Sequence, residues 1–581
     1  MQLQRHHKKT AVLAALGLAV ALAAPAALAA DTTPNETPLE LANSTLSYEA
    51  ATEGIVLFDN AGAALPLTAG GNIALFGVGS YKTVKGGTGS GDVNQRAVIN
   101  VRKGFEDAGY TVTTSSAYWD AMVAKADTPS GGGGFMGGGV DYAGAEEPLD
   151  ATTVQPTSPT DVAVYTLARN SGEGSDRSSG AGDYLLNATE LANITLIGQT
   201  YKQVVVALNV GGVVDTSFYA EVNANNTDPD GGPALDSLVL ASQLGQNTGK
   251  ALVAVLKGDV TPSGKTVDTW AANYADYPAA PTFANADSNT LNEEYLEGIY
   301  VGYRYFDSFY GALGGANPEK VVNYPFGYGG SYTTFSLTAG TVTADTDNIT
   351  VPVTVENTGT TYSGKEVVEV YYSAPQTGLD KPYQELAGYA KTDTLAPGGK
   401  QTLTVSFPTT SLASYDETSQ AYTLEGGDYV IRVGNSSRNT HVAGLVNVPS
   451  TITTEQLRNE FDDPNLSGPE LTSDPANFYT YNGEAAEIAA ANTVTLDFSA
   501  WVTPNNASTV TQSVDVTSSD PLYALDRDKI SAVTVLRPTG ETDWEGTGAP
   551  YAAKTGETVV PNQAADLQNT TLFDIAKITD A

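Results

Sequence analysis

The sequence predicts an α/β sandwich, in which helices cover both faces of a mostly parallel sheet, followed by an antiparallel β-sandwich. Two observations predict this order. From about residue 45 to 320, short apolar runs alternate with segments of helical periodicity, as in parallel sheets that are buried on both faces. After Phe335 apolar residues recur at every second position, which is typical of strands that bury one face.

The composition excludes several classes of function. Of the 581 residues 41% are hydrophobic, which is enough to build packed cores. The formal net charge of −37 repels phosphate backbones and anionic lipids, so we expect no nucleic acid and no membrane as partners. Cysteine is absent and only three histidines are present. We therefore expect no metal and no other cofactor, and acid–base chemistry that depends on carboxylates.

Residues 1–29 have the pattern of a secretory signal peptide. A basic stretch through Lys9 precedes an apolar run, and Ala27-Leu28-Ala29 forms a small-x-small cleavage site. A membrane anchor is the alternative, but the run is short and Pro25 interrupts it. We therefore expect a secreted, extracellular protein.

The elements of the first domain follow from periodicity. Near-continuous apolar runs predict strands at 72–80, 161–169 and 204–212, and helical periodicity predicts helices around 98–105, at 189–201 and at 248–257. Between residues 117 and 160 the alternation fails, and residues 131–139 read GGGGFMGGG. We interpret this glycine run as an inserted loop, because a phosphate-binding loop would need a lysine and a following helix.

Strands of period two predict the second domain. The segments GKEVVEVYY, QTLTVSF and DYVIRVG place alternate apolar residues on one side, for example Val368, Val370 and Tyr372. From about residue 450 the chain is polar and rich in Thr, Asn, Asp and Pro. That composition predicts a linker or a small irregular β-element.

A glycine-flanked carboxylate is the main candidate for chemistry. Glu173 lies in ARNSGEGSDRSSG, residues 168–180, directly after a predicted strand. Ligands of parallel sheets collect at the carboxyl ends of strands, and glycines permit close approach of a substrate. Judged by position alone, a solvated surface role for Glu173 is the more common alternative, because the chain has 66 acidic residues.

Two other features have simpler interpretations. His441, in RNTHVAG, is expected to be a surface or edge residue of the β-sandwich. Residues 226–232, NTDPDGG, match the first half of a calcium loop. The twelfth position of that loop is Ser237 rather than glutamate, so we expect a solvated turn.

Several sequence blocks, taken in their order along the chain, resemble one known family. Between about Leu46 and Val448 the chain resembles glycoside hydrolase family 3, of the β-glucosidase and β-xylosidase type. The blocks EGIVLFDNAGAALPL, IALFGVGSYKTVKGGTGSGDVN and LGQNTGKALVAVLKGDVTPSGKTVDTW resemble its α/β-sandwich "C-terminal" domain. NEEYLEGIYVGYRYFD and YPFGYGGSYTTF resemble its junction, and ENTGTTYSGKEVVEVYY through GGDYVIRVGNSSRN resembles its fibronectin-III-like domain.

The resemblance implies roles for three residues. The SGEG motif at 171–174 and the following Asp176-Arg177 match the family's acid/base loop, which makes Glu173 the acid/base. Asp176 and Arg177 would contact the substrate or support Glu173, and an ion pair that orders the loop is an equal alternative. The substrate implied is a glycoside or oligosaccharide.

The resemblance also implies domain boundaries. We expect a signal peptide at 1–29, the α/β-sandwich domain at 30–325 and the fibronectin-III-like domain at 326–448. A polar tail or linker at 449–581 would then lead toward a missing barrel. The family nucleophile is an aspartate on a (β/α)₈ barrel, and such a barrel needs about 250 residues of strand and helix alternation.

The expected position of the barrel departs from the usual domain order. Some members have the α/β domain first and the barrel last, and this chain is similar to the front part of that arrangement. We expect a truncated reading frame, or a partner chain that carries the barrel. Asp543, in a Thr-Asp-Trp triplet, resembles the nucleophile motif only locally.

We therefore expect the acid/base-bearing part of a secreted, retaining β-glucosidase-like glycoside hydrolase, inactive without its barrel. The alternative is a secreted, non-catalytic carbohydrate-binding or scaffold protein with the same fold.

Overall fold

The computed structural model describes residues 35–87, 95–128, 140–154, 162–171, 177–283, 286, 295–458 and 471–506, and the backbone of two short strands beyond them. The chain divides into two compact units. The larger unit holds the α/β sandwich and the β-sandwich. The smaller unit comprises Ala413–Leu424, Ile452–Asp463 and Ala500–Ala581.

A six-stranded sheet forms the centre of the first domain, with strand order β1-β6-β5-β4-β2-β3. Its neighbouring strands are parallel except β1, which runs antiparallel to β6. The strands are β1 (Val56–Asn60), β2 (Gly71–Phe76), β3 (Tyr110–Val112), β4 (Val162–Ala168), β5 (Gln203–Asn209) and β6 (Ser237–Leu240). The predicted strands at 72–80, 161–169 and 204–212 correspond to β2, β4 and β5.

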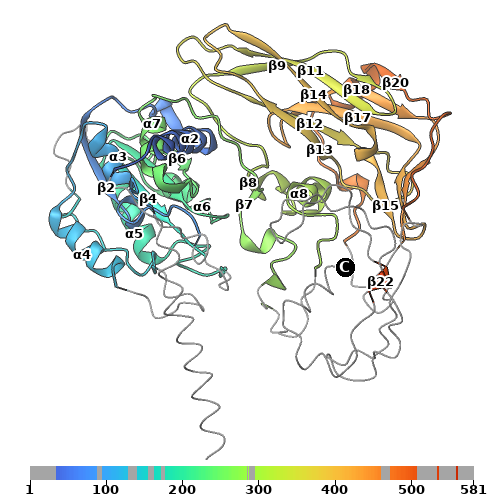
Figure 1. Cartoon of the computed structure of the whole chain (residues 1–581). Helices are drawn as coiled ribbons and strands as arrows, with labels where there is room; N and C mark the ends of the chain where they lie inside the picture. The colour runs from blue at the N-terminus through green and yellow to red at the C-terminus, as the bar shows by residue number, and fades with distance from the viewer. Residues whose placement is uncertain are drawn as a thin grey trace, which may run out of the picture. The chain divides into compact units, whose positions relative to one another are not determined.

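Six helices surround this sheet on both faces, as Figure 1 shows for α2, α3 and α7 on one side and α4 and α5 on the other. They are α2 (Pro38–Gly54), α3 (Val101–Asp107), α4 (Ser116–Ala126), α5 (Ala188–Thr200), α6 (Ser217–Asn225) and α7 (Thr248–Leu256). Because helices cover both faces, β4 and β5 are buried over six consecutive residues each. The predicted mostly parallel α/β sandwich is confirmed.

Two helix starts show how local sequence fixes the boundaries. At α5, Asn187 and Glu190 form a reciprocal capping box, which satisfies backbone donors at the helix end. At α3, the Asn100 side chain accepts a hydrogen bond from the Lys103 amide and caps the helix. Val98 was expected on the apolar face of this helix, but it lies before the cap and is 44% exposed.

A junction segment links the first domain to the β-sandwich. It contains the two-stranded sheet of β7 (Trp270–Ala271) and β8 (Val322–Tyr324) and the short helix α8 (Tyr303–Ser308). Glu53 at the end of α2 forms ion pairs with two lysines of the β-sandwich, Lys365 and Lys391. The two domains therefore share charged contacts as well as a covalent connection.

The β-sandwich has two sheets. One sheet joins β9 (Phe335–Ala339), β10 (Thr343–Ala344), β11 (Asn348–Asn357) and β14 (Lys400–Pro408). The other has the order β13-β12-β17-β18-β20, with strands at Glu385–Lys391, Val367–Ser373, Gly427–Gly434, Thr440–Val448 and Thr493–Thr495. All pairings are antiparallel except that of β18 with β20. The predicted antiparallel β-sandwich is confirmed.

Strand β12 departs from the simple alternation that the sequence predicts. Val368, Val370 and Tyr372 are buried as expected, but Glu369 and Tyr371 on the opposite face are also buried, at 4% and 0% exposure. The Tyr371 ring packs edge-on against Tyr303 of α8, at 5.9 Å between ring centroids. The junction segment covers this face of the sheet, so both faces of β12 are inside the protein.

The segment after residue 470 contributes to the larger unit. Helix α9 (Glu484–Ala490) packs on β18, and β20 extends the sheet. Arg432 of β17 forms a buried ion pair with Glu484, at 2.6 Å from Nη2 to Oε1. This part of the predicted polar tail is thereby anchored to the β-sandwich.

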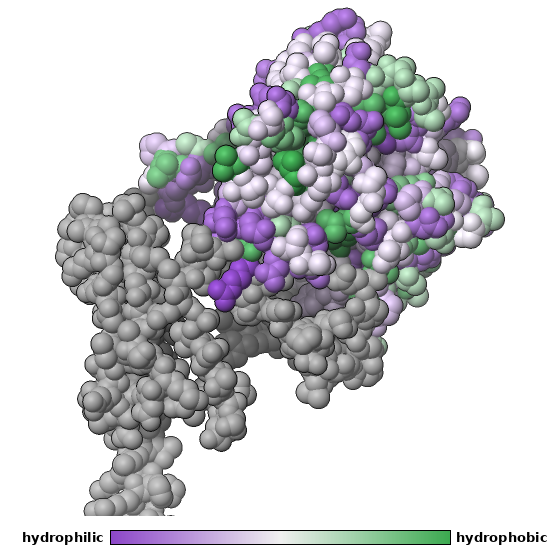
Figure 2. Space-filling model, turned by 90° about the vertical axis from the view of Figure 1, so that its right-hand side faces the viewer, coloured by the Kyte–Doolittle hydropathy of each residue, from purple (hydrophilic) through white to green (hydrophobic). Residues whose placement is uncertain are grey.

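The smaller unit has a three-stranded antiparallel sheet of β15 (Ser414–Asp416), β16 (Ala421–Leu424) and β19 (Ile452–Gln456). A further antiparallel pair joins β21 (Val533–Thr534) and β22 (Thr558–Val559). Across the described part of the chain, the helices are all too short or too polar to cross a lipid bilayer. Figure 2 shows hydrophobic residues scattered in small groups among hydrophilic ones on one face of the molecule.

Candidate functional site

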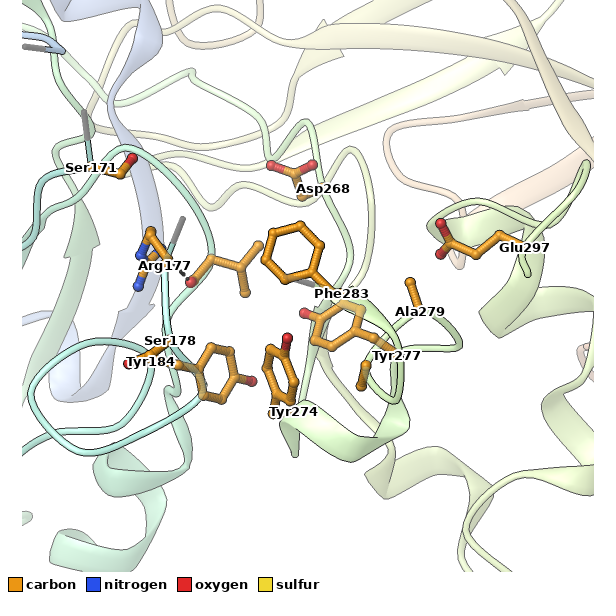
Figure 3. A pocket seen from close by; sticks show the side chains of 12 residues that line it. Ser171, Arg177, Ser178, Tyr184, Asp268, Tyr274, Tyr277, Ala279, Phe283 and Glu297 are labelled. Atoms are coloured by element: carbon orange, nitrogen blue, oxygen red, sulfur yellow. Dashed lines mark hydrogen bonds between the residues drawn. The ribbon is translucent and has the colours of Figure 1, made fainter. Parts of the chain in front are cut away.

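A pocket of about 570 Å³ lies beside the loops that follow β4 and β5. Its size is within the ~300–1,000 Å³ typical of small-molecule sites. Its lining residues come from these loops and from the junction segment: Ser171, Arg177, Ser178, Tyr184, Val213, Asp268, Tyr274, Tyr277, Ala279, Ala280, Phe283 and Glu297. Figure 3 shows these side chains converging from the two segments. The pocket is thus at the edge of the sheet where parallel folds bind ligands.

Two of the three predicted site residues, Glu173 and Asp176, lie at 172–176, outside the described residues. The described residues on either side of this stretch, Ser171 and Arg177, both line the pocket. The loop of the predicted acid/base therefore leaves and rejoins the described structure at the pocket wall.

The third predicted residue, Arg177, is held in place by its own loop and a neighbour. Its Nε donates to Asp183 Oδ1 at 2.7 Å, and its Nη1 donates to the Val213 carbonyl at 2.9 Å. Asp183 also accepts from the Ser178 amide at 2.5 Å. The Nη2 atom is buried and has no hydrogen-bond partner among the described residues. Arg177 therefore joins the segment around Asp183 to the loop after β5.

Beneath the pocket, a buried ion pair fixes the start of the same loop. Arg169 forms a bidentate pair with Glu190, at 2.7 and 2.8 Å, and the two side chains are only 4% and 2% exposed. Arg169 Nε also donates to the Asp183 carbonyl at 2.7 Å. One guanidinium thus links the end of β4, the loop and the first turn of α5. The sequence analysis missed this pair, although the capping-box spacing of Asn187 and Glu190 was a signal for the helix end.

Two amide side chains connect the neighbouring loops at the sheet edge. Asn209, fully buried at the end of β5, donates to the carbonyls of Val84 and Ser242 at 2.9 and 2.6 Å. Gln243 donates to the Arg169 carbonyl at 3.1 Å. These bonds hold the loops after β2, β4, β5 and β6 in a fixed relation.

Four aromatic side chains form much of the pocket wall. The ring centroids of Tyr184 and Tyr274 are 5.2 Å apart in an edge-to-face arrangement, and those of Tyr274 and Tyr277 are 6.4 Å apart. Tyr277 donates to the Thr269 carbonyl and accepts from the Ala271 amide, which fixes its ring. Phe283 also lines the pocket and is 46% exposed. Sequence analysis missed all four, because they lie in segments without periodicity.

The pocket also contains two acidic side chains, Asp268 and Glu297. Burial raises the pKa of each carboxyl group above its ordinary value. Neither forms an ion pair with a described residue. Figure 3 shows Asp268 above the Phe283 ring and Glu297 on a different side of the pocket. They are groups that can accept hydrogen bonds from a ligand.

The most perturbed carboxyl group of the α/β domain lies outside the pocket. Burial raises the pKa of Glu146 to about 7, although the Val78 amide donates to it at 3.2 Å. Glu146 is 5% exposed and also accepts from Asn193 at 3.2 Å. A perturbed pKa often marks a catalytic group, but this group is enclosed by core residues. We assign it to the interior.

The two simpler interpretations from the sequence agree with the structure. The His441 side chain is 68% exposed, on β18, and lies 3.1 Å from Glu487. Residues 226–232 form a turn in which Asp228 accepts from the amides of Asp230 and Gly232. Within the described ranges, no three His, Asp or Glu side chains group as a metal site would require. Asp543 lies outside the described residues.

Comparison with known proteins gives two domain matches. Residues 55–303 match the glycosyl hydrolase family 3 C-terminal domain, and residues 366–437 match the fibronectin type III-like domain. These matches cover the α/β sandwich with its pocket and most of the second sheet of the β-sandwich.

Individual relatives are similar over both domains. The chain is 34% identical to β-glucosidase A of Butyrivibrio fibrisolvens over 460 residues, which covers 71% of this chain and 52% of that protein. It is 34% identical to a β-glucosidase of Ruminococcus albus over 418 residues, covering 70% of this chain and 41% of the relative. The chain thus spans about half the length of these relatives, or less.

Solved structures of β-glucosidases are also similar to this chain. A β-glucosidase from Paenibacillus barengoltzii matches with a TM-score of 0.62 and 34% identity, over 71% of this chain and 44% of that one. β-Glucosidase 3B from Thermotoga neapolitana in complex with glucose matches with a TM-score of 0.62 and 33% identity, over 72% and 55%.

Proposed function

Because its α/β sandwich and fibronectin-III-like domain belong to glycoside hydrolase family 3, we propose that this chain is the acid/base-bearing part of a β-glucosidase-like enzyme. The observation that carries the proposal is the pocket at the carboxyl ends of β4 and β5, because the loop with the SGEG motif begins and ends at its wall. The substrate would be a β-glycoside or an oligosaccharide.

In this proposal Glu173 is the acid/base. It would protonate the glycosidic oxygen as the bond to the leaving group breaks, and then take a proton from the attacking water. Arg177 supports the same loop through Asp183 and Val213 and has a buried donor that faces no described partner. Asp176, next to it in sequence, would contact the substrate or order the loop.

The nucleophile would come from a barrel domain in the same protein or in a partner chain. A retaining mechanism needs a second carboxylate about 5–5.5 Å from the acid/base. Within the described ranges, the parallel strands of the α/β domain form one open sheet rather than a closed barrel. The active site would therefore be completed when the barrel docks, and this chain alone would hydrolyse glycosides very slowly.

We also propose that residues 1–29 direct secretion and that the mature chain begins at Ala30. The domains of the mature chain would be 30–325, 326–448 and the segment 449–581. N-terminal sequencing of the protein exported by a bacterial host tests this proposal. A mature N-terminus at Ala30 is expected, and an exported chain that retained Met1 would contradict it.

The test of function is hydrolysis of an aryl β-glucoside by the purified chain, alone and mixed with the barrel domain of a relative with swapped domain order. We expect hydrolysis to appear on mixing. Glu173→Gln should remove it, and Glu221→Gln, which changes an exposed carboxylate on α6, should not. If Glu173→Gln left full activity, the assignment of the acid/base would be wrong. Sugar binding without turnover in every mixture would favour the alternative, a non-catalytic carbohydrate-binding or scaffold protein.

A further inference from the structure

We propose that the contact between the α/β domain and the β-sandwich is a pH-sensitive switch, which stays closed in acid and opens more often as the Glu369 carboxyl loses its proton. The contact consists of Glu369 and Tyr371 of β12 against the segment 325–330. The proposal does not depend on the proposed function, because it needs neither a substrate nor a second chain.

The segment 325–330 is fixed to the α/β domain by its hydrogen bonds. The Tyr328 hydroxyl donates to the Phe58 carbonyl of β1 at 3.0 Å. The Tyr328 carbonyl accepts from the Thr266 amide at 2.8 Å, and the Thr266 carbonyl accepts from the Gly327 amide at 2.9 Å. This segment therefore moves with the α/β domain when the contact opens.

The β-sandwich contributes a buried carboxyl group. Glu369 is 4% exposed, and in the described structure its carboxyl accepts a hydrogen bond from the Tyr371 hydroxyl at 2.6 Å. The backbone of Gly327 lies directly against it, because a Cβ at this position would overlap both carboxyl oxygens. Gly327 also has a φ of 79°, which favours glycine. The carboxyl is thus enclosed between the two domains.

The charged groups nearest to Glu369 already form a pair with each other. Lys265, from the α/β domain, pairs with Glu366 at 2.9 Å, and the two side chains are 10% and 9% exposed. Lys265 attracts a negative charge on Glu369, whereas Glu366 repels it. The residues beside Glu369 in the sheet, Tyr389 and Gly434, carry no charge at neutral pH.

Other charges near the contact are also paired. Asp307 of α8 pairs with Arg438 at 3.0 Å, and Glu53 pairs with Lys365 and Lys391. Among these described acidic groups, Glu369 is therefore the one without an ion-pair partner.

The environment of Glu369 sets the direction of the pH effect. A buried carboxylate without its own cation is costly, whereas a neutral carboxyl that keeps its hydrogen bond is not. Burial accordingly raises the pKa of Glu369 from 4.5 to about 7. When the contact opens, water reaches the carboxyl and its pKa returns toward 4.5. Because the raised pKa belongs to the closed form, the closed form is most stable below pH 4.5 and loses stability as the pH rises to 7.

The test is hydrogen exchange measured by mass spectrometry on the purified full chain, from pH 5 to 8. Exchange rates are corrected for the pH dependence of the chemical exchange step. In peptides that cover 264–268 and 325–330, the fraction of open molecules should rise about tenfold per pH unit up to pH 7 and level off above it. Peptides from β4 and β5 provide the internal reference and should not show this rise.

Three variants distinguish the contact from the rest of the fold. Glu369→Gln keeps the size of the side chain and an oxygen that accepts from Tyr371, so it should remove the pH dependence. Glu146→Gln is the matched control, because Glu146 is a buried carboxyl of similar pKa inside the α/β domain, and it should leave the interface profile unchanged. Tyr371→Phe removes a hydrogen bond that favours the charged form, so the rise should continue above pH 7. It provides a second test that does not require Glu369→Gln to fold.

Four results would overturn the proposal. The first is exchange in 325–330 that does not vary with pH in the wild-type chain. The second is the wild-type pH profile in Glu369→Gln. The third is loss of the pH dependence in Glu146→Gln as well, which would mean that the whole domain opens rather than the contact. The fourth is a Tyr371→Phe profile that still levels off at pH 7.

Discussion

Replacement of Arg169 by methionine tests the idea that a buried ion pair supports the site. The guanidinium makes hydrogen bonds to Glu190, to the Asp183 carbonyl and to the Ala168 carbonyl. Methionine fills much of the space of the arginine side chain. It leaves the Glu190 carboxylate, which is 2% exposed, without its charged partner. Removal of one partner from a buried pair costs about 3–5 kcal/mol. The two charge-assisted bonds to Glu190, at about 1.5–3 kcal/mol each, give a similar figure.

The assay is urea denaturation followed by circular dichroism, on the single variants Arg169→Met and Glu190→Gln, on the double variant and on one control. Arg169→Met should lower the free energy of unfolding by about 3–5 kcal/mol. Adding Glu190→Gln to it should recover about 1–2 kcal/mol, because a buried amide without a partner costs less than a buried carboxylate. Glutamine also keeps the capping box of α5. The matched control is Arg102→Met, because Arg102 pairs with Glu106 on an exposed helix face, and it should cost under about 1 kcal/mol.

Two results would refute this reasoning. One is a cost for Arg169→Met that equals the cost of Arg102→Met. The other is additivity, in which Glu190→Gln and Arg169→Met together cost as much as the sum of the two single changes. Additivity would mean that the two side chains do not interact in the folded protein.

Three further changes test other parts of the fold. Glu146→Gln should stabilise the protein by up to about 3 kcal/mol at pH 8 and have little effect near pH 4.5, because burial raises the folded-state pKa of the Glu146 carboxyl from 4.5 to about 7. The wild-type protein therefore loses stability as the pH rises from 4.5 to 7, and the glutamine variant does not. Urea denaturation midpoints at several pH values measure this difference. Gly249→Ala should destabilise the protein by about 1–3 kcal/mol in the same denaturation assay, since its Cβ would lie 2.1 Å from the Asn100 carbonyl oxygen, whereas Lys250→Ala, on an exposed position of the same helix, should not. Glu53→Gln should cost under about 1 kcal/mol, and less in high salt, because its ion pairs with the two lysines of the β-sandwich are about one third exposed; an equal cost in high and low salt would contradict an ionic origin.

Much of the fold could be predicted because burial leaves a period in the sequence. Strands β4 and β5 are buried on both faces and read as unbroken apolar runs, and α5 and α7 repeat at helical spacing close to the observed bounds. Prediction was weaker where tertiary contacts override the local pattern. Glu369 of β12 occupies a position that the alternation predicts to be exposed, yet it is only 4% exposed because the backbone at Gly327 lies against it. Strand β20 is three residues long in a polar segment and exists because β18 offers it an edge.

The same distinction between local and tertiary features applies to the functional site. The SGEG loop could be found because its glycines and its place after a strand are local properties of the chain. The groups that shape the pocket are not local: Tyr184 follows that loop, whereas Tyr274, Tyr277 and Phe283 come from a segment far along the sequence. Tyr274 opens a 3₁₀ turn, Tyr274–Asp276, whose start is fixed by Asn273 and Asp276. No periodicity marks such a turn, so only the closure of the junction segment onto the β4 loop brings the rings together. The residues that shape the pocket could therefore be found only from the structure of this junction.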